Sequence, residues 1–335
     1  MKAEARSSEN SKGRLPWNPL PPPAALNRFL QARELTRFEL LTQLRHPAFW
    51  LSVAACAAAG VAFGATDLGA LSAAPGRLAR NVPVGVVTGL SGLSSVGMII
   101  ALVLVGTAGL RDSASGMTPL ILSKPVSRLS LLAGRYTGAV LAVLAAMSVG
   151  ALAMAATYAA HSGSDPAITA GTAWPWVVGM VLFVVPNVLF ISSFVLLAAL
   201  STHRISTTFL AVLPVIVGQD IAEALASTHP DSWLPALMDP IGFAALQAVT
   251  RGWTVAEFQH DLPALTGPLL ANRLLWLAIT PALLALCLRV LSRHPRADRS
   301  PSSKDEADGA TASPTLPGAP ALPGATAASP APLRV

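Results

Sequence analysis

Three stretches of the chain carry no charged residue, and each is long enough, as a helix, to cross a membrane. They are Asn81 to Leu110, Tyr136 to Ala160 and Ala167 to Thr202. An α-helix satisfies its own backbone hydrogen bonds in lipid and crosses the hydrocarbon core with about 20 apolar residues. Charged residues make up only 12% of the chain, against about 25% in soluble domains. These features predict an all-α polytopic membrane protein.

The same reading of the whole chain predicts six transmembrane helices. They cover residues 48–66, 84–110, 133–159, 175–200, 205–225 and 270–290. The first follows His46 and Pro47 directly. The sixth is flanked by Arg273 and Arg289, whose long side chains can reach the membrane interface.

The distribution of lysine and arginine predicts the orientation. If the amino terminus is cytoplasmic, the outer segments hold only Arg77, Arg80, Arg251 and Arg273 of the 23 Lys and Arg residues. Basic residues concentrate on the cytoplasmic side of membrane proteins. Both termini are therefore expected in the cytoplasm.

The segments outside the spans differ in composition. Residues 24–47 place large apolar residues at mostly helical spacing among four arginines, which is typical of an amphipathic helix at the inner membrane surface. Such a helix can be a simple anchor or can dock a partner, and the pattern leaves both open. Residues 1–23 are expected to be flexible, and the Pro/Ala/Gly/Ser-rich residues 293–335 to be a disordered cytoplasmic tail.

Several enzyme motifs are missing from the sequence. It has no GxxxxGK[ST] phosphate loop, no HExxH and no GxSxG, so P-loop ATP hydrolysis, zinc peptidase and serine hydrolase chemistry are not expected. Cys56 and Cys287 both lie in predicted spans, which leaves no disulfide framework or CxxC metal site. The chain is expected to be no enzyme, with no cofactor or metal.

The stretch between the second and third spans is basic and broken by proline. After Gly116, the sequence MTPLILS can form about two turns of helix, which end at Lys124 because Pro125 disfavours helical geometry. Ser127 can cap the next helix, which runs into the third span. The short helix has a basic rim of Lys124, Arg128 and Arg135. It can insert into a groove of a partner, or the stretch can be a basic loop that only sets topology.

Residues 111–136, RDSASGMTPLILSKPVSRLSLLAGRY, resemble the cytoplasmic loop of ABC-2-type transporter permeases. The family pattern falls on Arg111, Asp112, Gly116, Leu120, Lys124, Pro125, Arg128, Leu131, Leu132, Gly134 and Arg135. Met117 stands where threonine is common, and Thr118 follows it. The resemblance implies a coupling helix in this loop that rests on a separate P-loop ATPase subunit.

The resemblance extends over most of residues 30–292, so residues 48–292 are expected to form a six-span permease domain. The segments LMDPIGFAALQAVTRGWTVAEF and LLANRLLWL are similar to a narrower group, bacterial proteins in which permease halves are fused to an M1-type aminopeptidase domain. This chain has one six-span half and no HExxH. Any peptidase activity is therefore expected to belong to another chain.

The resemblance implies a permease subunit of an ABC-2-type exporter in a bacterial cytoplasmic (inner) membrane. A second permease copy or a paralogue would complete the transport path. A different class stays open, namely a membrane-embedded regulatory or scaffolding component that couples an ATPase to a partner protein without moving a solute. A secondary transporter fits less well, because the spans lack paired charges and obvious inverted repeats. No nucleic-acid partner is expected, and the sequence does not identify the solute.

Three polar residues in the predicted spans are candidate functional residues. Asp220 and Glu223 share one face near the outer end of the fifth span, where a carboxylate is a functional candidate by default. The helix can also end there, which would put both in interfacial water. Asn187 follows Pro186 in the fourth span, and its amide can satisfy the backbone groups that proline frees.

Two further patterns concern helix packing and the outer segment. Gly85 and Gly89, like Gly134 and Gly138, form GxxxG motifs that allow close helix approach, either within the chain or between copies. Residues 226–270 are long for a structureless loop and carry an apolar face. The family resemblance implies external helices that dip into the outer leaflet, and a folded external cap is the alternative.

Overall fold

The computed structural model describes residues 24–66, 81–117, 126–165, 168, 171–229 and 231–293. The chain divides into two units, Met1–Arg296 and Ala297–Val335, and all described residues belong to the first. The expected flexible amino terminus (residues 1–23) and nearly all of the expected tail (residues 293–335) lie outside the described residues.

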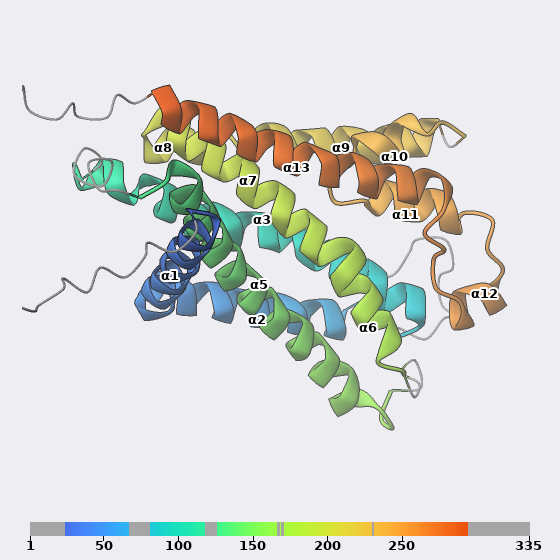
Figure 1. Ribbon diagram of the computed structural model, residues 1–335. Helices are drawn as coiled ribbons and strands as arrows, with labels where there is room; N and C mark the ends of the chain where they lie inside the picture. Colours follow the sequence, from blue (N-terminus) through green and yellow to red (C-terminus); the bar gives the residue numbers. More distant parts are fainter. Residues whose placement is uncertain are drawn as a thin grey trace, which may run out of the picture. The chain divides into compact units, whose positions relative to one another are not determined.

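The described residues are helical and contain no strand; an isolated bridge joins Ser162 and Asp165. In chain order the helices are α1 (Ala24–Arg45), α2 (Pro47–Ala65), α3 (Pro83–Ala114), α5 (Arg128–His161), α6 (Trp174–Gly179), the π-helix η2 (Met180–Val184), α7 (Val185–Thr202), α8 (Ile205–Leu210), α9 (Leu213–Thr228), α10 (Leu234–Met238), α11 (Phe243–Thr250), α12 (Val255–His260) and α13 (Gly267–Arg293). Figure 1 shows their arrangement.

In the described part of the chain, six helices or runs of helices are long and apolar enough to cross a membrane. They cover Pro47–Ala65, Pro83–Arg111, Arg128–His161, Trp174–Thr202, Ile205–Thr228 and Gly267–Arg293. Each coincides with one span expected from the sequence, within a few residues at either end. They indicate a multi-pass membrane protein, as the sequence predicted.

The break between α1 and α2 lies at His46. Its backbone is extended, and its Nδ1 atom accepts a hydrogen bond from the Ala48 N–H at 3.2 Å. Pro47 occupies the first turn of α2, where its missing N–H removes no helical hydrogen bond. Trp50 Nε1 donates back to the Leu44 carbonyl oxygen at 3.1 Å. The first span therefore begins at Pro47, one residue before the predicted start at residue 48.

Helix α5 contacts α1, α2, α3, α7 and α13, so most of the described structure is built around it (Figure 1). Its backbone touches that of α2. A Cβ atom added at Gly60 of α2 would collide with the Gly150 carbonyl oxygen, and one added at Gly150 would lie 2.8 Å from the Cys56 oxygen. Glycine is therefore required at this crossing, because any side chain would separate the two helices.

Helix α1 lies on the first turns of α5 in the same way. A Cβ atom at Gly134 would collide with the Leu35 side chain, and one at Gly138 would lie 2.7 Å from Glu39 Cβ. The GxxxG motif of the third span thus serves packing within the chain. In the second span, Gly89 faces Met154 of α5.

The buried face of α1 is not its most apolar one. Glu39 and Gln43 are each only 3% exposed, whereas Phe29 and Phe38 are 66% and 64% exposed. The sequence predicted a helix here from the spacing of its large apolar residues, and that helix is present. Its packing face, however, combines the buried polar residues Glu39 and Gln43 with leucines that are only partly buried, such as Leu40 and Leu44.

Helix α3 packs between α5 and α7, and α7 packs in turn against α13. The core between these helices is filled by fully buried side chains such as Leu93, Leu104 and Met147. Near the end of α3 a Cβ atom at Gly109 would lie 2.8 Å from Ala199 Cβ of α7. These three helices and α5 therefore form one continuous apolar core.

The fourth span is not a continuous α-helix. Met180–Val184 form one turn of π-helix between α6 and α7, and Pro186 is the second residue of α7. Proline cannot donate to the carbonyl oxygen four residues earlier, which here belongs to Leu182. A π-turn also rotates the residues on its two sides relative to each other. The Leu182 carbonyl group therefore lacks the donor that it would have in a continuous α-helix.

Residues 234–260 form three short helices, of which α10 and α11 are part of the main packing. Ala236 of α10 and Leu246 of α11 are buried together with Phe183 of η2 and Leu269 of α13. Helix α12 is closed by a capping box between Thr254 and Glu257 and contacts the start of α3. The segment between the fifth and sixth spans is thus folded onto the other helices.

We predict that Gly60→Ala lowers the free energy of unfolding by about 1–3 kcal/mol, because the added methyl group meets the α5 backbone and overpacks the crossing. Gly218→Ala in α9 is the matched control, because nothing lies within 4 Å of its added Cβ atom. Thermal unfolding of the two purified variants in detergent measures the difference. Equal melting temperatures would show that the α2–α5 crossing is not as close as described.

Candidate functional site

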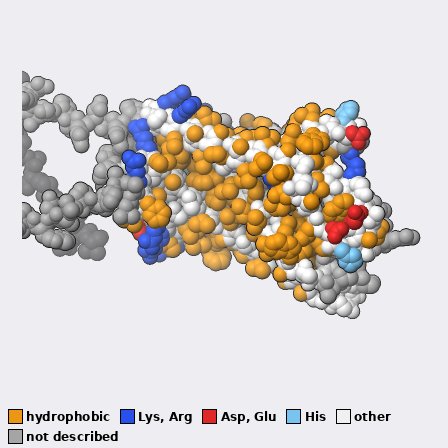
Figure 2. Space-filling view, turned by 45° about the vertical axis from the view of Figure 1, so that its right-hand side comes forward, with side chains coloured by type: hydrophobic (Ala, Val, Ile, Leu, Met, Phe, Trp, Pro, Cys, Tyr) orange, Lys and Arg blue, Asp and Glu red, His pale blue; other side chains and the backbone are white. Residues whose placement is uncertain are grey.

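Charged side chains divide between the two ends of the helices. One end, called the arginine-rich end below, comprises α1, the end of α3, the start of α5, the start of α8 and the end of α13. Its arginines are Arg28, Arg33, Arg37, Arg45, Arg111, Arg128, Arg135, Arg204, Arg289 and Arg293. Figure 2 shows one face of the molecule with basic side chains at this end, a broad apolar surface, and acidic and histidine side chains at the opposite end.

A partly buried ion pair joins α1 to α3 at the arginine-rich end. Both guanidinium nitrogens Nη1 and Nη2 of Arg111 donate to the Glu39 carboxylate at 3.0 Å. The Glu39 side chain is 4% exposed and that of Arg111 35%. Gln43 donates to Glu39 at 3.1 Å and to the Leu104 carbonyl oxygen at 2.9 Å. A two-pronged pair of this kind fixes orientation as well as distance, so α1 has a defined position on α3.

The start of α5 is tied to both α1 and α13. Ser127 caps α5, as predicted, and its hydroxyl oxygen accepts from the Ser130 N–H at 3.0 Å. The Ser130 hydroxyl group donates to the carbonyl oxygen of Arg28 in α1 at 3.0 Å. Arg128 donates to the Ser292 carbonyl oxygen at the end of α13 at 2.9 Å. Three helix ends therefore meet at the start of α5.

The two helices that flank residues 115–127, α3 and α5, are thus fixed to their neighbours. Helix α3 extends to Ala114, and Gly116 follows it in the left-handed region (φ 67°), where glycine commonly ends a helix. Met117 is 53% exposed. The predicted coupling helix and its residues Leu120, Lys124 and Pro125 lie outside the described residues. Two other predicted loop residues, Gly134 and Arg135, lie inside α5, and Gly134 packs against α1.

A network of buried polar side chains lies near the opposite end, between α13, the π-turn of the fourth span and the α10–α11 connection. It consists of Asn187, Asp239, Asn272 and Arg273 and is called the polar network below. The exposed fraction is zero for Asp239 and Asn272 and 3% for Arg273. None of these side chains can be left without partners in an apolar environment.

Arg273 is the central donor of the polar network. Its Nε atom donates to Asn272 Oδ1 at 2.8 Å, and its Nη1 atom donates to Asn187 Oδ1 at 3.0 Å and to the Leu182 carbonyl oxygen at 3.3 Å. The guanidinium group also lies 5.1 Å from the centre of the Phe183 ring, a cation–π distance. The carbonyl group that Pro186 leaves without a helical donor is therefore satisfied from α13.

The two asparagines join the network to the segment between α10 and α11. Asn187 donates to the Ile241 carbonyl oxygen at 3.1 Å. Asn272 donates to the Asp239 carbonyl oxygen at 2.7 Å and also to that of Ala236. The carbonyl groups of this connection are therefore held from both the fourth and the sixth spans.

Asp239 uses its carboxylate to close the turn between α10 and α11. Its oxygens accept from the Ile241 N–H at 2.8 Å and the Ala244 N–H at 2.7 Å. Burial raises the pKa of Asp239, while these backbone donors and the nearby Arg273 act in the opposite direction. Gly242 between them has φ 87°, and a Cβ atom there would collide with the guanidinium group of Arg273. Glycine is required here for both its conformation and its size.

Two sequence-based interpretations are wrong at this place. Arg273 was expected to reach the membrane interface, but its side chain is buried in the polar network. The Asn187 amide was one candidate partner for the backbone freed by Pro186, but it binds Ile241 and Arg273, and Arg273 donates to Leu182 instead. These partners come from segments distant in sequence. The signals available in the sequence were the polar pair Asn272–Arg273 inside an apolar run and the Asp-Pro-x-Gly turn at 239–242.

Asp220 and Glu223 are not part of the polar network. Both lie on α9, which continues to Thr228 rather than ending beside them. Both side chains are exposed, and Glu223 accepts from Gln219 at 3.2 Å. Of the three predicted polar candidates, only Asn187 therefore lies among other buried polar groups.

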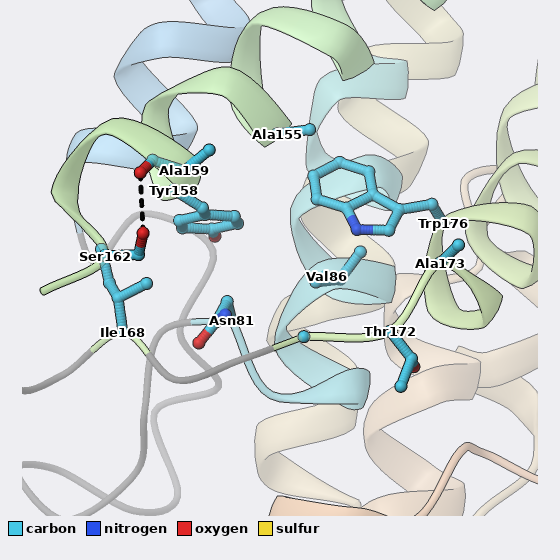
Figure 3. Close-up of a pocket in the computed structure, with 11 residues that line it drawn as sticks. Asn81, Val86, Ala155, Tyr158, Ala159, Ser162, Ile168, Thr172, Ala173 and Trp176 are labelled. Atoms are coloured by element: carbon cyan, nitrogen blue, oxygen red, sulfur yellow. Dashed lines mark hydrogen bonds between the residues drawn. The ribbon is translucent and has the colours of Figure 1, made fainter.

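A cavity of about 380 Å³ opens near the same end of the molecule, between the start of α3, the end of α5 and the start of α6. Figure 3 shows Tyr158 and Trp176 facing it, with Asn81, Ser162 and Thr172 around its rim. The two aromatic rings lie 6.2 Å apart. Aromatic walls with a polar rim suit a small amphipathic molecule.

Comparison with models of known protein families gave no match, and comparison with curated proteins gave none either.

We predict that Arg273→Leu lowers the free energy of unfolding by about 3–5 kcal/mol, because it leaves Asp239 without a nearby cation and removes donors from Asn187, Asn272 and Leu182. Arg289→Leu is the matched control, since Arg289 lies on the same helix with an exposed side chain. SDS-induced unfolding of the two variants measures the effect. Similar losses of unfolding free energy in both variants would show that the buried contacts of Arg273 add no more stability than an exposed arginine does.

Proposed function

We propose that this chain is the permease subunit of an ABC-2-type exporter in a bacterial cytoplasmic membrane. A separate P-loop ATPase supplies the energy, and a second permease copy or a paralogue completes the transport path. The chain itself carries out no catalysis. Its cytoplasmic face is the arginine-rich end, and both termini lie on that side.

One observation carries the proposal: the stretch that resembles the coupling loop of ABC-2 permeases is anchored in fixed helices at the arginine-rich end. Helix α3, in which the stretch begins, is held by the Glu39–Arg111 ion pair. Helix α5, in which it ends, is held by the Ser130 and Arg128 hydrogen bonds. A docking element transmits force only if its base is rigid. A loose basic loop that merely set topology would need none of these contacts.

The charge distribution supports the orientation. Apart from Arg251 and the buried Arg273, the arginines of the described residues lie at the arginine-rich end. Basic residues are enriched on the cytoplasmic side of membrane proteins. The exposed arginines there also offer an ATPase subunit a surface for electrostatic steering.

We predict that Leu120→Asp abolishes stimulation of the ATPase partner while leaving membrane expression unchanged, because an apolar side chain at this position enters the groove of the partner. Arg128→Gln should weaken stimulation several-fold, since it removes a charge from the rim and the bond to Ser292. Co-purification of the ATPase and transport-linked hydrolysis in vesicles are the measurements.

Leu265→Asp is the matched control for Leu120→Asp, because Leu265 is an exposed leucine between α12 and α13, at the opposite end of the helices. It should leave coupling intact. Normal stimulation by the Leu120→Asp variant would reduce the loop to a topological role. Stimulation without any solute flux in the parent protein would favour a regulatory component over a permease.

We predict that cysteines introduced as Asp231→Cys and Gln247→Cys react in intact cells with a membrane-impermeant thiol reagent, whereas Ser302→Cys reacts only after lysis. The two native cysteines, Cys56 and Cys287, are buried and give little background. Labelling of Ser302→Cys in intact cells would reverse the proposed orientation.

A further inference from the structure

A second cavity lies within the membrane-spanning part, between α9 on one side and α7 and α13 on the other. Its volume is about 320 Å³ and its walls are almost wholly apolar. Phe190 and Phe194 contribute from α7, Gly218 from α9, and Trp276 and Leu283 from α13. We call it the α9 groove.

The lining of the α9 groove offers a ligand almost no polar surface. The one polar atom of the Trp276 side chain, Nε1, already donates to the Leu237 carbonyl oxygen at 3.2 Å. The Trp276 ring packs edge-to-face on Phe190 with centroids 4.6 Å apart, so the wall is fixed in place. Met238 and Pro240 close the groove next to the buried Asp239. Only an apolar molecule matches this lining, and water does not occupy apolar cavities of this kind.

The depth of the groove places it in the hydrocarbon region. With a rise of 1.5 Å per residue, Trp276 and Leu283 lie roughly 14 and 24 Å along α13 from Gly267, inside a helix about 40 Å long. The flanking surface of α9 is apolar and exposed at Leu213 and Val217. The groove is therefore continuous with the lipid-facing surface of the spans.

The size of the groove limits what can fill it. A volume of about 320 Å³ over a length of about 10 Å along α13 gives a cross-section on the order of 30 Å². A helix with its side chains is about 10–12 Å wide and does not fit. An extended hydrocarbon chain does, and filling the groove restores the dispersion contacts that an empty space lacks.

We infer that the α9 groove binds one acyl chain of a membrane phospholipid, selected by its hydrocarbon and not by its head group. The bound chain fills the space between α9 and the α7–α13 pair and supports the fifth span, of which only 17% is buried within the chain itself. The inference rests on the membrane-spanning character of the helices and is independent of the proposed transport function.

Gly218→Leu tests the inference. Nothing lies within 4 Å of a Cβ atom at Gly218, and Gly218 lines the groove, so a leucine there has room to start and extends into the space that a ligand would occupy. Val217→Leu is the matched control, because Val217 is its neighbour on α9 with an exposed side chain. The full-length parent and both variants are purified in mild detergent, and the phospholipid retained per chain is measured by mass spectrometry of extracts.

The parent and Val217→Leu should retain phospholipid of every head-group class in the source membrane, and Gly218→Leu should retain at least several-fold less. Vesicles containing phosphatidylcholine with a diazirine in its acyl chain supply a second readout. The parent should be labelled at α7, α9 and α13 residues of the groove, and Gly218→Leu should lose that label.

Three outcomes would overturn the inference. The first is equal lipid retention and equal labelling in Gly218→Leu and Val217→Leu. The second is a change of oligomeric state in Gly218→Leu with unchanged lipid, which would make the groove a site for a second copy of the chain. The third is retention of a single head-group class, which would place recognition outside the groove.

Discussion

Close approach of neighbouring helices at the glycines of α5 is the interaction on which the rest of this structure depends. Helices in lipid gain little from hydrophobic burial against each other, so they associate through close packing. Helix α5 supplies Gly134 and Gly138 to α1 and Gly150 to α2. Because α1 lies so close to α5, Glu39 of α1 reaches Arg111 of α3. A larger residue at Gly138 would move α1 outward and separate that ion pair.

The second constraint is that every buried polar group must have a partner within the protein. Pro186 leaves the Leu182 carbonyl oxygen without its helical donor, and Arg273 from another span donates to it. The Arg273 guanidinium group then needs acceptors of its own, which Asn187 and Asn272 provide. Asp239 also lies near the Arg273 cation, and its carboxylate accepts a hydrogen bond from the turn that follows α10. The missing N–H group of Pro186 thus affects the hydrogen bonding of three helices, η2, α7 and α13.

The sequence predicted those features that depend on local composition. Uncharged apolar runs predicted the six spans, Pro47 predicted the start of α2, and Ser127 predicted the start of α5. It did not predict the partners of residues that meet only through tertiary packing. Arg273 in an apolar run has the same local pattern whether it reaches the interface or enters the core. The positions of its acceptors on the fourth span, Leu182 and Asn187, decide between the two.

The face of α1 was unpredictable for the same reason. Large apolar residues normally mark the packed side of a helix. By that rule Phe29 and Phe38 would lie on the buried face of α1, and Glu39 and Gln43 would be exposed. That rule holds where the neighbour is an apolar surface in water. Here the neighbour is a helix with glycines at the contact, which Leu35 and Glu39 of α1 approach closely, and the phenylalanines remain exposed. An exposed phenylalanine on this helix is consistent with a lipid-facing position.

The polar network also bears on how this chain can move. A π-turn beside a proline is the natural bending point of a helix, and here it lies in the fourth span between α6 and α7. Arg273 binds Leu182 on one side of Pro186 and Asn187 on the other. Any bend at this point must therefore break or exchange hydrogen bonds of a buried cation. Such a change favours two discrete arrangements over a continuous range, because intermediate geometries leave the guanidinium group without acceptors in an apolar interior.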